Sequence, residues 1–375
     1  MKAFFQRPTK LILKDLFISV FVVLIIIGII RLTLAYFEAE PNEMTLGNCA
    51  LENCEIPFAI NNINHFYISS KGQDNPTCDL NNPCLTFAQA EALAQPGDTI
   101  YLTGSLEAIT IAKSGQPNAP ITIQGDNAIL KGLTINGDYI HVYNIEVVGS
   151  DSHGILVQSK HVLVQDSIVR NSVTENGENG QCGMGEEVRW GSGLKIRVGA
   201  EDVILRGNQV FNNCGEGIAI TRGARILLEE NIVGSNYSVG IYIDNSYDVI
   251  AQNNAVTCDD TYLRNGNRMS GIVVAGELYS DGNWGMQVHD IKILNNRVDG
   301  CYTNYSAWET DDESPIRNLL IDGNISLNAV RYSIDIDALG ADIVVSNNII
   351  DKPVHYNAED PGVTVVNNQI IETPP

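Results

Sequence analysis

Short runs of alternating apolar and polar residues recur along most of the chain. Seven copies of one eight-residue phrase have asparagine at the sixth position: VILRGNQV, ILLEENIV, VIAQNNAV, IKILNNRV, LLIDGNIS, IVVSNNII and VTVVNNQI. Alternation with period two is typical of β-strands, and a repeat near 23 residues is typical of a solenoid. The shared asparagines are Asn208, Asn231, Asn254, Asn296, Asn324, Asn348 and Asn368.

A second alternating phrase begins nine residues after the asparagine in most copies, and it usually starts with glycine. Gly217 follows Asn208 at this offset, and the same count from Asn296 falls on Tyr305. Two strands per repeat with an asparagine at the corner predict an all-β fold, a single-stranded right-handed parallel β-helix. We interpret the asparagines as structural, because inward amides can bond to turn backbone in neighbouring coils.

The stretch FYISSKGQDNPTCDLNNPCLTFAQAEALAQPGDTIYLTG, residues 66–104, resembles the opening of pectate-lyase-like, right-handed β-helix proteins. It has a first strand, a loop rich in Asp, Asn and Pro, a Pro-Cys-x-Thr-Phe entry to a helix, and Pro-Gly-Asp-Thr-Ile-Tyr. The Ala-rich helix TFAQAEALAQ would cap the exposed end of the coil stack. The resemblance extends over residues 64–372, and it implies the fold more than any activity.

An apolar run, LFISVFVVLIIIGII at residues 16–30, follows four basic residues and continues after Arg31. With Arg31 reaching the membrane surface, this length matches the roughly 20 residues that a membrane helix needs. The basic side favours a cytoplasmic amino terminus. A cleaved signal peptide ending at Ala35 is the alternative.

We therefore expect a single-pass membrane protein whose β-helix lies outside the cytoplasm, at the cell surface or in the periplasm. Its predicted parts are a cytoplasmic basic segment at 1–15, a transmembrane signal anchor at 16–37, a linker at 38–63, and the capped β-helix domain at 64–372.

The amino-acid composition limits the classes of partner that this domain can bind. With 44% apolar and 18% charged residues, the 375-residue chain can bury a core. Its net charge of −22 argues against non-specific nucleic-acid binding, which requires a basic surface. Calcium or a cationic partner fits this charge better.

Eight cysteines, all beyond the apolar run, suggest disulfides in an oxidising compartment. Zinc is less suitable because no Cys-x-x-Cys pair occurs. The repeat register places Cys258 and Cys301 in the same turn of adjacent coils, and it brings Cys182 near Cys214. We expect the remaining cysteines to form two local pairs, Cys49 with Cys54 and Cys78 with Cys84.

Chemistry on a β-helix must come from outward side chains and from inserted loops. Counting from the glycine position, the second and fourth residues point outward. Long insertions flank this face, and aromatic rings beside a polar trench are typical of sugar-binding grooves. The alternative is that the rings only shield loop backbone. The outward candidates are Lys195, Arg197, Asp244, Glu309, Asp335 and Asp337, and the aromatic candidates are Trp190, Tyr242, Trp284 and Trp308.

Two cleavage chemistries compete for this groove. A glycoside hydrolase needs two carboxyl groups about 5 Å apart for retention, or roughly 6.5–9.5 Å apart for inversion. Glu309 and Asp337, on adjacent coils, would lie near the first separation, and Asp244 with Glu309 near the second.

A lyase acting on a uronic-acid polymer instead needs a base and a cation that neutralises the substrate carboxylate. Lys195 and Arg197 could supply these charges, with Ca²⁺ held by Asp244 and less firmly by Asp335.

The sequence has no clear match to the catalytic motifs of pectate lyases, mannuronate epimerases or polygalacturonases. A non-catalytic role therefore stays open, as a surface scaffold, an adhesin or an accessory subunit of a membrane complex. The expected partner is a polysaccharide or another cell-envelope component. The non-catalytic role would also allow a protein partner.

Overall fold

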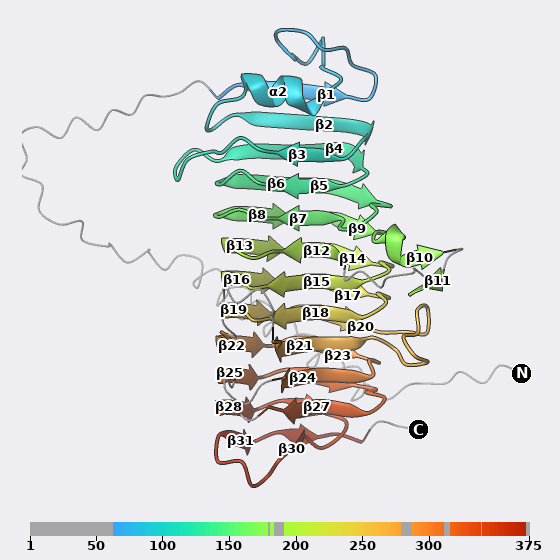
Figure 1. Ribbon diagram of the computed structural model, residues 1–375, viewed down its shortest axis with the longest axis vertical. Helices are drawn as coiled ribbons and strands as arrows, with labels where there is room; N and C mark the ends of the chain where they lie inside the picture. Colours follow the sequence, from blue (N-terminus) through green and yellow to red (C-terminus); the bar gives the residue numbers. More distant parts are fainter. Residues whose placement is uncertain are drawn as a thin grey trace, which may run out of the picture. The chain divides into compact units, whose positions relative to one another are not determined.

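The computed structural model describes residues 63–178, 181–183, 191–278, 287–310, 316–338 and 340–372. The predicted cytoplasmic segment, the membrane anchor and nearly all of the linker lie outside this part of the chain. Within it, no helix is both long enough and apolar enough to cross a bilayer. The described residues form a stack of coils in which strands of successive coils run parallel (Figure 1).

Two parallel sheets run along this stack. The smaller sheet takes one strand from each coil: β3 (Ile109–Ile111), β5 (Leu133–Ile135), β7 (Ile155–Val157), β12 (Ser192–Ile196), β15 (Glu216–Thr221), β18 (Val239–Asp244), β21 (Ser270–Gly276), β24 (Thr303–Glu309), β27 (Tyr332–Asp337) and β30 (His355–Tyr356).

The larger sheet begins with four single strands and then takes pairs of strands separated by the asparagine corner. The single strands are β1 (His65–Ser69), β2 (Thr99–Leu106), β4 (Ile121–Leu130) and β6 (Ile140–Val148). The pairs are β8 (Val162–Gln165) and β9 (Ile168–Arg170), β13 (Glu201–Arg206) and β14 (Gln209–Phe211), β16 (Ala224–Glu229) and β17 (Ile232–Gly234), β19 (Tyr247–Gln252) and β20 (Ala255–Thr257), β22 (His289–Leu294) and β23 (Arg297–Asp299), β25 (Arg317–Asp322) and β26 (Ile325–Leu327), β28 (Ala341–Ser346) and β29 (Ile349–Ile350), and β31 (Val363–Val366) and β32 (Gln369–Ile370).

Inward side chains form continuous apolar ladders inside the stack. In β15 and β18, Ile218 and Ile220 align with Ile241 and Ile243, and all four are fully buried. Coils stacked at about 4.8 Å bring such side chains into contact along the axis. Each coil therefore covers the apolar face of its neighbour, and the predicted all-β, parallel β-helix is confirmed.

The asparagine ladder joins the corners of seven coils. The backbone N–H and Nδ2 of Asn208 both donate to Oδ1 of Asn231 at 3.0 Å, and Nδ2 also donates to the carbonyl of Val164 at 2.9 Å. The same pattern continues from coil to coil as far as Asn368. The amides from Asn208 to Asn348 are buried and hydrogen-bonded, and Asn368 at the end of the ladder is partly buried, so their predicted structural role is confirmed.

A second buried amide ladder was not predicted. Asn213 and Asn236 lie five residues after members of the first ladder, and Asn213 donates through Nδ2 to Oδ1 of Asn236 at 2.9 Å. This ladder explains the glycine column. A Cβ at Gly217 would lie 2.7 Å from Nδ2 of Asn236 and 2.5 Å from the carbonyl oxygen of Gly240.

The register of β24 differs from the sequence prediction by one residue. Asn304, rather than Tyr305, takes the glycine position, and its Nδ2 donates to the carbonyl of Val298 at 3.2 Å. The turn before β24 is one residue shorter than the turns before β15, β18 and β27. A one-residue shift exchanges the two faces of a strand. Trp308 therefore occupies the outward position that the sequence prediction gave to Glu309.

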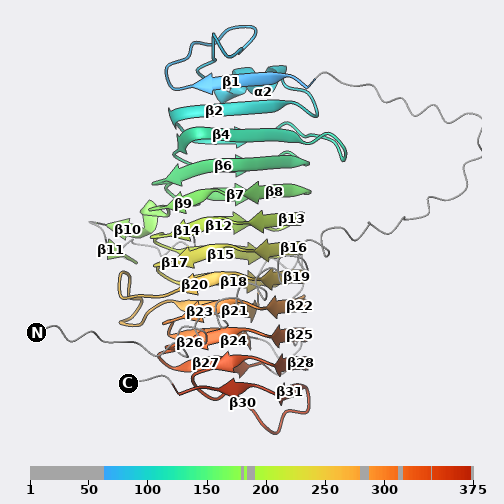
Figure 2. The same ribbon diagram turned by 180° about the vertical axis from the view of Figure 1, so that it is seen from behind.

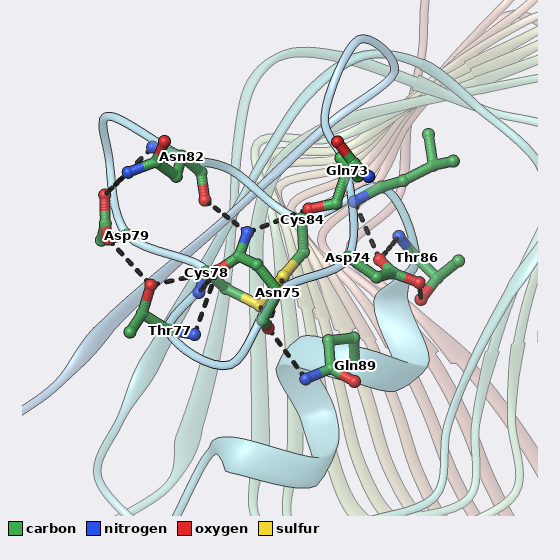
Figure 3. Close-up of a disulfide and its surroundings, with 11 residues drawn as sticks. Gln73, Asp74, Asn75, Thr77, Cys78, Asp79, Asn82, Cys84, Thr86 and Gln89 are labelled. Carbon is green, nitrogen blue, oxygen red and sulfur yellow. Dashed lines mark hydrogen bonds between the residues drawn. A yellow bond between two sulfur atoms is a disulfide. The ribbon is translucent and has the colours of Figure 1, made fainter.

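The amino end of the stack carries a short helix, α2 (Phe87–Leu93), which lies beside β1 (Figure 1). It falls within the segment TFAQAEALAQ, where the sequence predicts a capping helix. Asp74 fixes its start by accepting hydrogen bonds from the backbone N–H groups of Leu85 and Thr86 at 3.0 and 2.8 Å (Figure 3).

Three of the four predicted disulfides are confirmed: Cys78–Cys84, Cys182–Cys214 and Cys258–Cys301. The first closes the loop in front of α2 (Figure 3). The second holds an insertion that contains the 3₁₀ turn η1 (Thr174–Asn176) and the hairpin of β10 (Gly177–Glu178) and β11 (Gln181–Cys182) (Figure 2). The predicted pair of Cys49 with Cys54 lies outside the described residues.

Candidate functional site

A polar pocket of about 380 Å³ opens on the outward face of the smaller sheet, and we call it the central pocket. Strands β12, β15, β18, β21 and β24 supply its floor, and the loops that lead into and out of β21 supply part of its wall. The residues that carry its chemistry are Lys195, Glu216, Tyr242, Asp244, Arg264, Glu277 and Trp308.

Two columns of outward side chains cross the central pocket, because parallel pairing aligns equivalent residues of successive coils. The Lys195 column contains Lys195, Ala219, Tyr242, Val273, Ser306, Asp335 and His355. The Asp244 column contains Thr221, Asp244, Ala275, Trp308 and Asp337. Successive members are separated by one coil, or about 4.8 Å.

The middle of the floor is apolar. Ala219, Tyr242, Val273 and Ala275 form a small buried cluster on the outside of the sheet, and the ring of Trp308 packs against it. Small side chains beside large rings leave room for a flat ligand with apolar faces. Sugar rings have such faces, and they pack on aromatic side chains.

A buried ion pair occupies one end of the pocket. Lys195 Nζ lies 3.3 Å from Oε2 of Glu216, and the two side chains are only 10% and 6% exposed. Ser192 donates from Oγ to the same carboxylate oxygen at 2.6 Å. Separating the two charges would leave each buried without its partner, which costs free energy. The two side chains therefore stay paired in the folded protein.

His153 lies behind this ion pair on the preceding coil. Its Nδ1 accepts a hydrogen bond from the backbone N–H of Ser192 at 3.1 Å. Burial, together with the positive charges of Lys195 and Arg197, lowers the pKa of His153 to about 4. The imidazole is therefore neutral at pH 7 and carries its proton on Nε2.

Tyr242 lies at the centre of the pocket among carboxylates. Its hydroxyl donates to Oε1 of Glu277 at 2.7 Å, and its side chain is almost fully buried. Burial, followed by the negative charges of Asp244 and Glu277, raises the pKa of Tyr242 far above its usual value. Asn245 donates from Nδ2 to the carbonyl of Glu277 at 2.7 Å and so holds the loop that carries this carboxylate.

Arg264 reaches the pocket from the insertion between β20 and β21. Its Nη1 donates to Oγ of Ser238 at 3.2 Å. Its backbone forms a two-way bridge with Asn267, with N···O distances of 2.8 and 3.0 Å. Among the described lining residues, two cations therefore face three carboxylates.

The structure brings together four of the residues that the sequence analysis selected: Lys195, Tyr242, Asp244 and Trp308. Trp308 contributes because of the register shift in β24.

Other selected residues lie elsewhere. Arg197 is exposed at the end of β12. Glu309 and Asp337 line a separate pocket, and Glu309 accepts a hydrogen bond from the backbone N–H of Ile316 at 2.8 Å. The expected pairing of Glu309 with Asp337 in one outward column is therefore wrong, because Trp308 aligns with Asp337. Trp190 and Trp284 lie outside the described residues.

Sequence reasoning missed His153, Glu216, Arg264 and Glu277. His153 and Glu216 immediately precede the glycine position of their coils, a place that the outward-position rule did not consider. A count of the residues before each glycine would have found both. Arg264 and Glu277 lie in insertions, where the repeat gives no register.

Calcium was expected at Asp244 and Asp335, but these two residues do not share a site. They lie in different columns and three coils apart, and Asp335 pairs with Nδ1 of His355 at 2.7 Å. The described residues contain no group of three side chains able to hold a metal ion. A calcium role stays a prediction without an assigned site.

The sequence matches the model of a protein family described as "Right handed beta helix region" over residues 125–278 and 190–370. The chain belongs to this family, which agrees with the stacked parallel coils and with the resemblance noted in the sequence. No curated protein matches the sequence.

Solved structures similar to this chain are also β-helix proteins. An alginate lyase from Paenibacillus sp. str. FPU-7 is 17% identical, with a TM-score of 0.51, and the match covers 73% of this chain and 94% of that one. A rhamnogalacturonan lyase is 12% identical, with a TM-score of 0.48, covering 82% and 86%. A pectate lyase is 14% identical, with a TM-score of 0.41, covering 82% and 79%. At these identities the likeness concerns the fold alone.

Proposed function

We propose that this protein binds a neutral polysaccharide across the central pocket and hydrolyses its glycosidic bonds. The observation that carries the proposal is the arrangement around Tyr242. The buried phenol of Tyr242 donates a hydrogen bond to the Glu277 carboxylate, and burial together with Asp244 raises the pKa of this phenol. The phenol belongs to the apolar floor, against which the ring of Trp308 packs. A surface for stacking a sugar and a pair of carboxyl groups thus lie in one pocket.

The charge of the lining supports a neutral substrate. Glu216, Asp244 and Glu277 outnumber the cations Lys195 and Arg264, and Lys195 is already paired with Glu216. A polymer of uronic acids would bring negative charge to a pocket that has no excess of cations to neutralise it. A neutral glycan needs no such neutralisation.

Asp244 and Glu277 supply the two roles that hydrolysis requires. Asp244 protonates the leaving glycosidic oxygen, and Glu277 takes a proton from the water that attacks the anomeric carbon. The carbon–oxygen bond then breaks and the product acquires a hydroxyl group. Tyr242 orients the Glu277 carboxylate through its hydrogen bond, and Trp308 positions the sugar ring.

The test is an assay of the purified protein against neutral and acidic polysaccharides, which follows new reducing ends and the absorbance of unsaturated uronates together. We expect reducing ends from a neutral glycan without unsaturated uronates. Asp244→Asn and Glu277→Gln should each lower kcat by at least about a hundredfold, the order of magnitude for loss of a catalytic acid or base. The exposed Asp342→Asn serves as the matched control.

Unsaturated uronates would contradict hydrolysis and favour β-elimination, with Lys195 and Arg264 as the groups to mutate next. No product and no binding by a folded protein would favour the non-catalytic surface role. Repeating the assay with a chelator and with added Ca²⁺ tests the calcium prediction.

We also propose that residues 16–37 anchor the β-helix outside the cytoplasm. The apolar run with basic residues before it supports this proposal, as do the disulfides, which form in oxidising compartments. Alkaline extraction of membranes should leave the full-length chain in the membrane pellet. Recovery of a chain shortened after Ala35 in the soluble fraction would favour the cleaved signal peptide.

A further inference from the structure

A second pocket of about 420 Å³ lies farther along the same outward face, and we call it the distal pocket. It is lined by residues of β24, β27 and β30 and of the turns that follow them, including Glu309, Asp337, His355, Tyr356 and Asn357. None of these residues takes part in the central pocket.

Both pockets take a lining residue from the end of β24. Trp308 lines the central pocket, and the next residue, Glu309, lines the distal pocket. The Asp244 column continues from Trp308 directly to Asp337 on the next coil. A ligand extended from the central pocket along this column would cross the ring of Trp308 and reach Asp337, which lines the distal pocket.

The Lys195 column also links the two pockets and sets their separation. From Tyr242 the column passes through Val273, Ser306 and Asp335 to His355. Four coil steps at about 4.8 Å place Tyr242 and His355 about 19 Å apart along the stack. An extended oligosaccharide can span this distance, whereas a single sugar cannot.

The distal pocket contains an oriented imidazole. His355 Nδ1 lies 2.7 Å from Oδ1 of Asp335, so the carboxylate holds the proton on Nδ1 and leaves Nε2 for a ligand. The ring stacks on Tyr332 with centroids 4.4 Å apart, and the guanidinium of Arg331 lies over the same tyrosine, 4.7 Å from its centroid. Stacking and pairing together fix the direction in which Nε2 points.

We propose that the distal pocket binds a second sugar unit of the same polysaccharide through its hydroxyl groups, four coils from the bond that is cleaved. This inference rests on the proposed function of the central pocket. The carboxylates of Asp337 and Glu309 accept hydrogen bonds from hydroxyl groups, and His355 Nε2 supplies a further polar contact for a hydroxyl. The two carboxylates disfavour a carboxylate-bearing sugar. The protein therefore selects long neutral chains over short ones.

The experiment compares kcat/KM for long chains with kcat/KM for the shortest oligosaccharide that is cleaved, in the full-length protein. His355→Gln and Asp337→Asn should each lower this long-to-short ratio by about tenfold, the order expected for losing a hydrogen bond to a charged or oriented group. The control, Asp342→Asn, is an exposed aspartate of β28 in the larger sheet, and it should leave the ratio unchanged. Equal thermal midpoints show that the variants are folded.

A lower ratio in both pocket variants, with the control unchanged, supports the distal site. An unchanged ratio in an enzyme that still cleaves the polymer overturns the distal site and leaves the central pocket intact. Absence of binding and cleavage by the unmodified protein overturns the proposed function, and the distal site with it.

Discussion

At the scale of single residues, His153 shows how a side chain outside the repeat pattern becomes part of the site. Its neighbours are an ion pair and a backbone N–H, and its pKa is lowered to about 4 by burial and by the charges of Lys195 and Arg197. In the unfolded chain the pKa of histidine is about 6.5. Between these two values, the unfolded chain binds a proton that the folded protein does not.

The free energy of unfolding should therefore fall as the pH drops from about 6.5 towards 4, and His153 should cause part of that fall. Replacing His153 with glutamine keeps an acceptor for the N–H of Ser192 but removes the titration. Compared with His153→Gln, the unmodified protein should lose on the order of 2 kcal/mol between pH 7.5 and pH 4.5.

Urea unfolding of both proteins at several pH values measures this difference, with His65→Gln as an exposed control. If the two unfolding curves shift in parallel with pH, His153 titrates normally in the folded protein, and its assigned place behind Lys195 is wrong.

The sequence predicted individual residues only where the repeat fixed their direction. Lys195, Tyr242 and Asp244 were found because they stand at outward positions counted from a glycine. Glu277 was missed because it lies just past the end of β21, where alternation stops. Its carboxylate is directed by a hydrogen bond to Tyr242 rather than by strand geometry.

At the scale of elements, the asparagine corners hold adjacent strand pairs in register. Asn254 donates from its backbone N–H and from Nδ2 to Oδ1 of Asn296, each at 2.9 Å. Its Oδ1 accepts from both the N–H and the Nδ2 of Asn231 at 3.0 Å. Each amide therefore serves two turns, and its loss leaves buried donors without acceptors.

Asn254→Ala should lower the free energy of unfolding by about 3 kcal/mol, since buried unsatisfied polar groups cost on the order of 1–3 kcal/mol each. The outward-facing Gln209→Ala should change it by less than about 0.5 kcal/mol. Denaturant titration of both variants checks this. Similar small effects from the two substitutions would mean that the ladder does not stabilise the corners.

At β24 the repeat spacing no longer predicts which residues face outward. A count of nine residues from the asparagine is correct for β15 and β18, but one residue is missing before β24. There Asn304 occupies the glycine position and bonds to Val298 from it. In the sequence this appears only as an irregular spacing. The structure shows that an asparagine at the glycine position can also satisfy the backbone groups of this corner.

At the scale of the whole molecule, the described part of the chain is a stack of repeated coils that carries two polar pockets. The fold was predictable because each coil must bury its apolar face against neighbouring coils. The eight-residue phrase that forms the corner of a coil occurs seven times in the sequence. The site was predictable only in part, since insertions and the distal turns break the repeat. Two columns of outward residues link the two pockets, and Tyr242 and His355 lie four coils apart along one of them.

The most direct test is a crystal structure of the Asp244→Asn variant bound to an oligosaccharide of the polymer that the unmodified protein cleaves. We expect one sugar ring on Trp308, the bond to be cleaved between residue 244 and Glu277, and the chain running along the columns towards His355. An oligosaccharide bound on another face of the stack, or in the pocket with no glycosidic bond near Glu277, would contradict the account.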